Sequence, residues 1–196
     1  MSRTALAAAT ALGVVAWAGR ATAQLHADVD LEAGAMERLL SSRPAGRNDP
    51  SPGPMFELSG HVAVVPLLRA GAYVSFDLSP VGGEDTREIL SAGFSGRLYS
   101  PWPRGNWRAW FSLGFGYAAS HAPAYASATA SSGGFFEVPV GVGASLRLAR
   151  SFELIGDLGT RIGFGFSGSM YNQSPSPPAG NDSFGAFLVV GAAYEL

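Results

Sequence analysis

Apolar and polar residues alternate along most of the chain. Between Trp107 and Tyr117, for example, every second residue is apolar, and the residues between them are polar or small except for Trp110. Alternation with a period of two predicts strands that have one apolar and one polar face. The pattern recurs eight times, and we expect strands at about 25–41, 55–66, 69–79, 88–99, 106–119, 134–149, 152–168 and 184–196.

The first of these strands has a competing interpretation. In the stretch LEAGAMERLLSS, residues Met36, Leu39 and Leu40 share one face of a helix. A barrel that begins and ends on the same side of a membrane needs an even number of strands, and this favours the strand. A short helical end at 37–41 is kept as an alternative interpretation.

Pro139 interrupts the sixth strand of the pattern. Proline has no backbone N–H and cannot donate to the ladder of a sheet. We therefore expect a β-bulge or an irregular hydrogen bond at this position.

The connections between the strands alternate in length. Residues 41–54, 79–87, 120–134 and 168–181 form long polar or Pro/Gly-rich connections, whereas residues 66–69, 100–106 and 149–151 form short ones. Long connections at one end and short turns at the other are typical of transmembrane barrels. The sequence thus predicts an all-β fold, an eight-stranded antiparallel up-and-down transmembrane β-barrel. The alternative, a soluble barrel or sandwich, requires a polar outer face, which these strands do not offer.

Aromatic residues gather near the strand ends, as in the two interfacial girdles of a membrane barrel. At the short-turn end we expect Trp102, Trp107, Phe152 and Tyr194. At the other end we expect Tyr117, Phe135, Phe136, Phe166, Tyr171 and Phe184.

The N-terminal segment has the features of a signal peptide. Arg3 precedes an apolar stretch, and Ala21-Thr22-Ala23 fits a cleavage site. We expect a signal peptide at 1–23 and the barrel at 24–196. The sequence has no cysteine, which excludes disulfides and thiolate ligands, and its net charge of −2 gives no indication of nucleic-acid binding.

The C-terminal stretch DSFGAFLVVGAAYEL alternates to its last residue. Together with the signal peptide, the eight strands and the long connections, this tail resembles the small outer-membrane β-barrel proteins of Gram-negative bacteria, the outer membrane protein A/X-like group. The resemblance implies an outer-membrane location, contact with outer-membrane lipid, and a C-terminal strand read by the barrel-assembly machinery. Tyr194 and Leu196 occupy the positions of that assembly signal, with Leu196 where phenylalanine is usual. No periplasmic domain is expected after the last strand.

Charged residues fall on the polar faces of the strands and therefore in the lumen. His26 lies on the same face, and we expect a network formed by Arg97, Arg108, Arg147, Glu153, Asp157, Arg161 and Glu195. Opposite charges in a dry lumen must pair. A structural network that closes the barrel is the favoured interpretation, and a gate in a narrow channel is the alternative. Several inward glycines leave space that is filled either by Tyr73, Tyr99 and Trp110 or by water.

Residues suited to catalysis are few. Ser120 and His121 are adjacent, with Glu137 on the next strand, but neighbouring residues of a strand point to opposite faces. His26 and His61 lie on separate strands, which argues against a metal site. We expect no catalytic residues, no metal and no cofactor.

The sequence therefore favours a non-enzymatic outer-membrane protein with a structural or surface-interaction role through its outer loops. A narrow pore or small-solute channel is the alternative, and a lipid-modifying enzyme is the third candidate. The surface ligand is not indicated.

Overall fold

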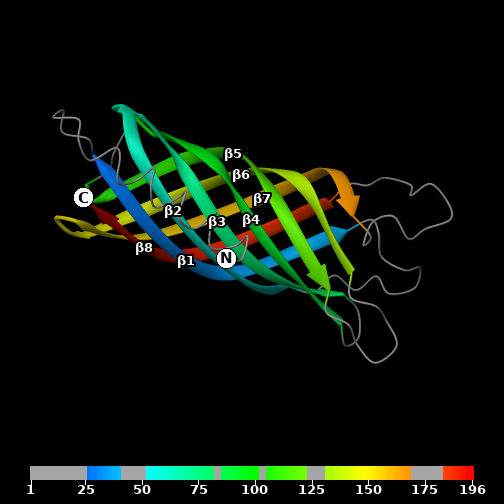
Figure 1. Ribbon diagram of the computed structural model, residues 1–196. Coiled ribbons are helices and arrows are strands. Elements are labelled where there is room, and N and C mark those ends of the chain that lie inside the picture. The colour runs from blue at the N-terminus through cyan, green and yellow to red at the C-terminus, as the bar shows by residue number, and fades with distance from the viewer. Residues whose placement is uncertain (1–25, 41–51, 82–84, 102–104, 123–130, 169–182) are drawn as a thin grey trace, which may run out of the picture.

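A computed structural model describes residues 26–40, 52–81, 85–101, 105–122, 131–168 and 183–196. These residues form a closed antiparallel barrel in which each strand pairs with the next and β8 pairs with β1 (Figure 1). The strands are β1 (Ala27–Leu40), β2 (Gly53–Val65), β3 (Leu68–Val81), β4 (Asp85–Tyr99), β5 (Trp107–Ala122), β6 (Ser131–Ala149), β7 (Phe152–Gly168) and β8 (Ser183–Glu195). The predicted fold class is confirmed, and the eight strands lie close to their expected positions.

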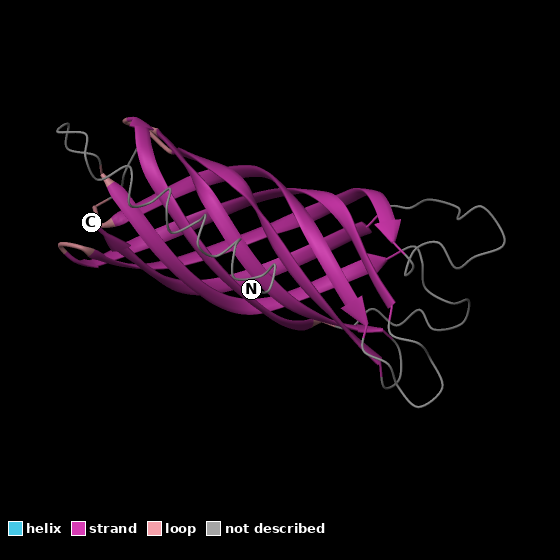
Figure 2. Cartoon of the chain, viewed as in Figure 1, coloured by secondary structure: helices cyan, strands magenta, loops and turns pink. Residues whose placement is uncertain are grey.

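The described part of the chain consists of strands and turns (Figure 2). None of these residues forms a helix long and apolar enough to cross a membrane. β1 continues to Leu40, where it still pairs with Ser183 of β8, so the helical end considered for residues 37–41 is wrong. β8 closes the barrel and supplies hydrogen-bond partners to this part of β1. This pairing outweighs the weak local preference of the segment for a helix.

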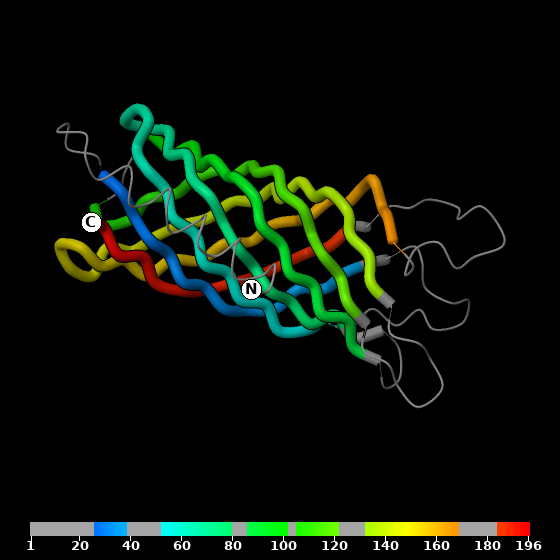
Figure 3. Tube along the Cα trace, in the orientation of Figure 1, coloured from blue at the N-terminus to red at the C-terminus, as the bar shows by residue number. Residues whose placement is uncertain are grey.

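The chain crosses the barrel obliquely in each strand (Figure 3). The short turns after β2, β4 and β6 lie at one end with the C-terminus, and we call this the short-turn end. The other connections leave from the opposite end, which we call the long-connection end. The predicted signal peptide, Trp102 and Tyr171 lie outside the described residues.

β3 and β4 extend further into residues 79–87 than the polar sequence of this stretch suggests. Pairing continues until Val81 faces Asp85, so only residues 82–84 separate the two strands. Ser79 and Arg87 are polar but buried, because they face the lumen. Their polarity reflects the interior of the barrel and is no sign of a loop.

The ladder between β5 and β6 is irregular at Pro139, as expected. Leu113 pairs with Val140 and Gly116 with Glu137, while the two positions between them are unpaired and the register is unchanged. The irregularity is therefore a local loss of pairing without a bulge. The ring of Pro139 fits against Gly114, where an added Cβ would lie 2.8 Å from the proline Cγ.

The barrel is apolar outside and charged inside. Large apolar side chains are exposed on the outer face of every strand, and Leu113, for example, is 52% exposed. Charged side chains such as Arg38, Glu137 and Arg161 are buried within the ring of strands. A soluble barrel has the reverse arrangement, so this surface suits a hydrocarbon environment.

Aromatic side chains form most of the two expected girdles. Trp107, Phe152 and Tyr194 are exposed at the short-turn end, and Tyr117, Phe136 and Phe184 at the other. Phe135 and Phe166 are exceptions that point inward and stack on each other with ring centroids 4.7 Å apart. The register of β6 against β7 shifts between Gly134 and Phe136, and Gly165 has a φ of 67°, which together reverse the alternation at Phe166.

Candidate functional site in the lumen

Three clusters of charged side chains cross the lumen. The first, the Arg161 cluster, contains Arg38, Glu57, Asp77, Glu137 and Arg161. Arg161 of β7 contacts Glu57 and Glu137 at 2.5 Å each, and Arg38 of β1 contacts Glu137 at 3.4 Å. The cluster thereby joins β1, β2, β3, β6 and β7, which enter it from different sides of the barrel.

The second cluster, the Arg97 cluster, contains Asp30, Glu32, Arg97 and Asp157. Arg97 forms an ion pair with Asp30 and lies 3.4 Å from Glu32 and 3.7 Å from Asp157. Its guanidinium group also lies over the ring of Trp110, whose indole N–H donates to Asp157 at 3.0 Å. A cation–π contact of this kind stabilises a desolvated arginine.

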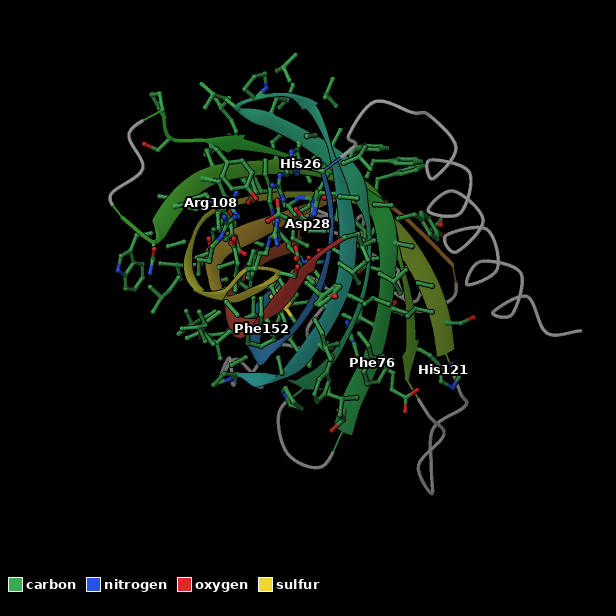
Figure 4. All side chains as sticks on the ribbon, turned by 90° about the vertical axis from the view of Figure 1, so that its left-hand side faces the viewer. His26, Asp28, Phe76, Arg108, His121 and Phe152 are labelled. Carbon is green, nitrogen blue, oxygen red and sulfur yellow. The ribbon has the colours of Figure 1, made fainter. Side chains whose placement is uncertain are left out.

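The third cluster, the Arg147 cluster, lies at the short-turn end and contains Arg108, Arg147, Glu153 and Glu195. Glu153 pairs with Arg108 and with Arg147, and Arg147 also contacts Glu195 at 3.1 Å. Figure 4 looks into the barrel from this end and shows Arg108 and Asp28 within the ring of strands. This cluster covers the mouth of the lumen.

The structure divides the residues that the sequence placed in one network among the three clusters. Arg97 and Asp157 are paired, and Arg108, Arg147, Glu153 and Glu195 form one group. Arg161 instead pairs with two carboxylates outside the predicted set, Glu57 and Glu137. His26 lies at the rim, with its side chain 63% exposed and 3.7 Å from Glu195.

Sequence reasoning missed several members of the clusters. Asp30, Glu32, Glu57 and Asp77 lie on the polar faces predicted for their strands, but only the strand register reveals their arginine partners. Arg38 was hidden by the competing helical interpretation of its segment. Arg38 lies an even number of residues from Asp30 and Glu32 and therefore falls on the same face of the strand. This spacing could have revealed it.

Aromatic side chains occupy the space above the inward glycines. A Cβ at Gly116 would lie 2.3 Å from the hydroxyl oxygen of Tyr73, and one at Gly143 would lie 2.3 Å from the ring of Trp110. Tyr99 packs against Trp110 with ring centroids 5.5 Å apart. Gly116 and Gly143 thus accommodate aromatic side chains.

Apolar side chains close the spaces between the charges. Met36, Met55, Phe187 and Val189 form one buried group, and Ile89, Ala118 and Phe135 form another with Phe166. Two cavities among the described residues have volumes of about 40 and 10 Å³. One water needs roughly 10–15 Å³ of such volume, so the larger cavity can hold a few waters and the smaller about one.

The residues considered for catalysis do not converge. Ser120 is buried and faces inward, whereas His121 is exposed on the outer face of β5. Glu137 is held by Arg38, Arg161 and the hydroxyl group of Tyr73. A nucleophile and a base must share a proton, and the opposite orientations of Ser120 and His121 prevent this.

A closed eight-stranded barrel with an apolar exterior and a charged, filled lumen defines a class, the small β-barrels of outer-membrane type. The structural comparisons agree with this class. The crystal structure of Neisserial surface protein A aligns with a TM-score of 0.64 and 12% identity, covering 87% of this chain and 97% of that protein.

Two further structures have the same fold. A major outer membrane protein of Thermus thermophilus aligns with a TM-score of 0.61 and 14% identity, over 89% of this chain and 100% of that one. The attachment invasion locus protein of Yersinia pestis, crystallised with a heparin analogue, aligns with a TM-score of 0.54 and 11% identity, over 89% and 100%. No protein-family model and no curated protein sequence matches this chain. The chain therefore has the fold of the outer membrane protein A/X-like barrels.

Proposed function

We propose that the chain is a non-enzymatic integral protein of the outer membrane that acts through the connections at its long-connection end. The single observation that carries this proposal is the filled lumen. Buried arginines and carboxylates pair across it, and apolar groups close the spaces between them. A barrel whose lumen is filled in this way would act through its outer surface or its ends.

The outer surface supports an outer-membrane location. Exposed apolar side chains surround the barrel, with aromatic residues near both ends. The chain carries an apolar first segment that we propose is removed as a signal peptide at residue 23. We further propose that Tyr194 at the end of β8 and Leu196 directly after it present the assembly signal, since both side chains are exposed.

The long-connection end supports a role in surface contacts. Four connections leave from it, between β1 and β2, β3 and β4, β5 and β6, and β7 and β8. Two of the structurally similar proteins are named as a surface protein and as an attachment protein. Contact with another surface is the role that we propose for these connections, with adhesion as one form of it.

A narrow pore is the second candidate. It is favoured by one observation, the cavity of about 40 Å³ that Glu32, Glu57, Arg97 and Arg161 help to line. Conduction would require at least the Arg161 and Arg97 clusters to rearrange, because their side chains cross the lumen. A lipid-modifying activity has no comparable support, since Ser120 and His121 face apart.

An accessibility experiment tests the proposed location and orientation. One epitope is inserted between Gly168 and Ser183, at the long-connection end, and a second after Arg150, in the short turn between β6 and β7. In intact cells of a Gram-negative host, antibody is expected to label the first epitope alone. Permeabilised cells should show both. Labelling of the Arg150 epitope in intact cells, or of neither epitope until the outer membrane is opened, would contradict the proposal.

A further inference from the structure

Three side chains, those of Asp28, Asp30 and His61, converge on one point of the lumen. Asp28 and Asp30 point inward from β1, and His61 points inward from β2, where it lies directly opposite Asp28 in the strand register. His61 Nδ1 lies 3.4 Å from Asp28 Oδ1 and 3.6 Å from Asp30 Oδ2. One ligand atom from each of the three residues lies within 4.8 Å of the other two.

These separations suit a metal ion. In a tetrahedral site with bonds of about 2.0–2.2 Å to nitrogen and oxygen, neighbouring ligand atoms lie roughly 3.3–3.5 Å apart. The two distances from His61 Nδ1 are close to this range. Imidazole and carboxylate together are a ligand set that Zn²⁺ and similar divalent transition metals accept.

Some polar atoms of these three side chains are buried and have no hydrogen-bond partner, although Asp30 Oδ2 accepts from Ser59 and pairs with Arg97. Among the described residues, Asp28 Oδ1, Asp30 Oδ1 and His61 Nδ1 lack a hydrogen-bond partner, and the His61 side chain is only 1% exposed. Buried polar atoms without partners are costly, and a cation between them would satisfy all three.

The other nitrogen of His61 is already engaged. Nε2 lies 2.9 Å from the hydroxyl oxygen of Ser95 on β4. When Nε2–H donates to Ser95, the lone pair of Nδ1 points toward the two carboxylates. A histidine that ligates a metal through one nitrogen commonly has its ring fixed through the other in this way.

Neighbouring arginines leave room for the ion. Arg69 pairs with Asp28 through Oδ2, which leaves Oδ1 available, and Arg97 pairs with Asp30 through Oδ2, which leaves Oδ1 available. Asp28 can therefore hold Arg69 with Oδ2 and a metal with Oδ1, whereas Asp30 Oδ2, which lies 3.6 Å from His61 Nδ1, also contacts Arg97.

Carboxyl groups outnumber guanidinium groups in the lumen. The described residues place nine carboxylates and seven guanidinium groups in the lumen and its short-turn mouth. The carboxylates are Asp28, Asp30, Glu32, Glu57, Asp77, Glu137, Glu153, Asp157 and Glu195, and the arginines are 38, 69, 87, 97, 108, 147 and 161. A cavity of about 10 Å³ is lined in part by Asp28, Asp30 and Glu195, and His61 lines the neighbouring cavity of about 40 Å³.

We propose that the lumen binds one divalent transition-metal ion of the Zn²⁺ class through Asp28, Asp30 and His61, with water as a fourth ligand. The ion would join β1 to β2 inside the barrel and complete the Arg97 cluster. The site lies in the short-turn half and does not depend on the role of the outer connections.

Metal binding to the folded full-length chain tests this proposal. The chain is prepared in detergent micelles without a polyhistidine tag, and its folding is checked by heat-modifiable migration. Titration with Zn²⁺ is followed by calorimetry, and titration with Co²⁺ by visible absorption. We expect one ion per chain, and a Co²⁺ spectrum of a low-coordinate site with nitrogen and oxygen ligands. Absence of binding to the folded chain would overturn the proposal.

Histidine variants locate the ion. His61→Ala is expected to weaken binding at least tenfold, whereas His26→Ala at the rim and His121→Ala on the outer face should leave it unchanged. Unaltered binding by His61→Ala, or equal losses in all three variants, would contradict the assignment. If His61→Ala does not fold, Ser95→Ala retains all three ligands and is expected to bind about 10- to 100-fold more weakly, because the ring is no longer fixed. Binding by Ser95→Ala at the affinity of the unaltered chain would then count against the site.

Discussion

Arg38 of β1 donates hydrogen bonds to both carboxylate oxygens of Asp77 on β3, at distances of 2.8–3.3 Å. Both side chains are fully buried. β2 lies between these two strands in the sheet, so the ion pair joins strands that share no ladder. Pairs of this kind link the wall of the barrel across its interior.

Removal of one partner should be costly. Arg38→Ala leaves the Asp77 carboxylate buried without its cation, and breaking a buried pair in this way costs about 3–5 kcal/mol. We expect a loss of this size in the free energy of unfolding, measured by urea denaturation in lipid vesicles. Arg150→Ala, at an exposed turn position, is the matched control and should have little effect. Equal stability of the two variants would show that the buried pair does not support the barrel.

Gly143 should not tolerate a side chain while Trp110 is present. A Cβ at this position would lie 2.3 Å from the indole ring and from Asp157 Oδ1, and overpacking of this kind costs about 1–3 kcal/mol. Gly156→Ala is the control, because its added Cβ would make only ordinary contacts at 3.5 Å and beyond. In a Trp110→Leu background, the cost of Gly143→Ala should fall. A cost that stays the same in that background would mean that the ring does not occupy the space above the glycine.

The outer face should reject charge in proportion to depth. Leu113→Arg places a cation at the presumed midplane, where the cost is about 2–4 kcal/mol, whereas Leu148→Arg lies near a turn, where the cost is about 0–1 kcal/mol. Both leucines are more than half exposed on the outer face, so burial within the protein does not explain a difference between them. Unfolding in lipid vesicles measures both costs. Similar values would contradict the assignment of a lipid-facing surface.

Assembly should depend on the end of β8. Replacement of both Tyr194 and Leu196 by serine is expected to reduce insertion into outer membranes severalfold, measured by fractionation and heat-modifiable migration. The control is Leu188→Ser, on the same exposed face of β8 but away from its end. Unchanged insertion of the double variant would show that these two residues carry no assembly signal.

The fold could be predicted from sequence because the side-chain period of a strand is a local property. The alternation indicated the number of strands and the apolar face of each. Strands joined by short turns pair antiparallel with each other, which indicated their order. The irregularity at Pro139 was foreseeable for the same reason, as it follows from a missing N–H. The inward orientation of Phe166 could not be predicted, because Gly165 with its positive φ reverses the alternation at that residue.

The lumen was harder to predict because charge pairing depends on register and on the curvature of the barrel. The sequence placed Arg161 in the interior, yet its partner Glu137 was considered only as a catalytic carboxylate. His61 and Asp28 lie 33 residues apart, and nothing in the sequence shows that they are opposite each other until β1 and β2 are paired. The sequence shows which residues lie on the same face of a strand. It does not show which residues of different strands come into contact.

The central claim is that buried charges and aromatic rings close the lumen. Single-channel recording of the folded chain in a planar bilayer tests it most directly, with heat-modifiable migration confirming that the barrel has formed. We predict a folded barrel with no steady openings. Discrete, stable openings from that same material would show that the lumen carries a continuous water path, and would favour the narrow pore over the surface role.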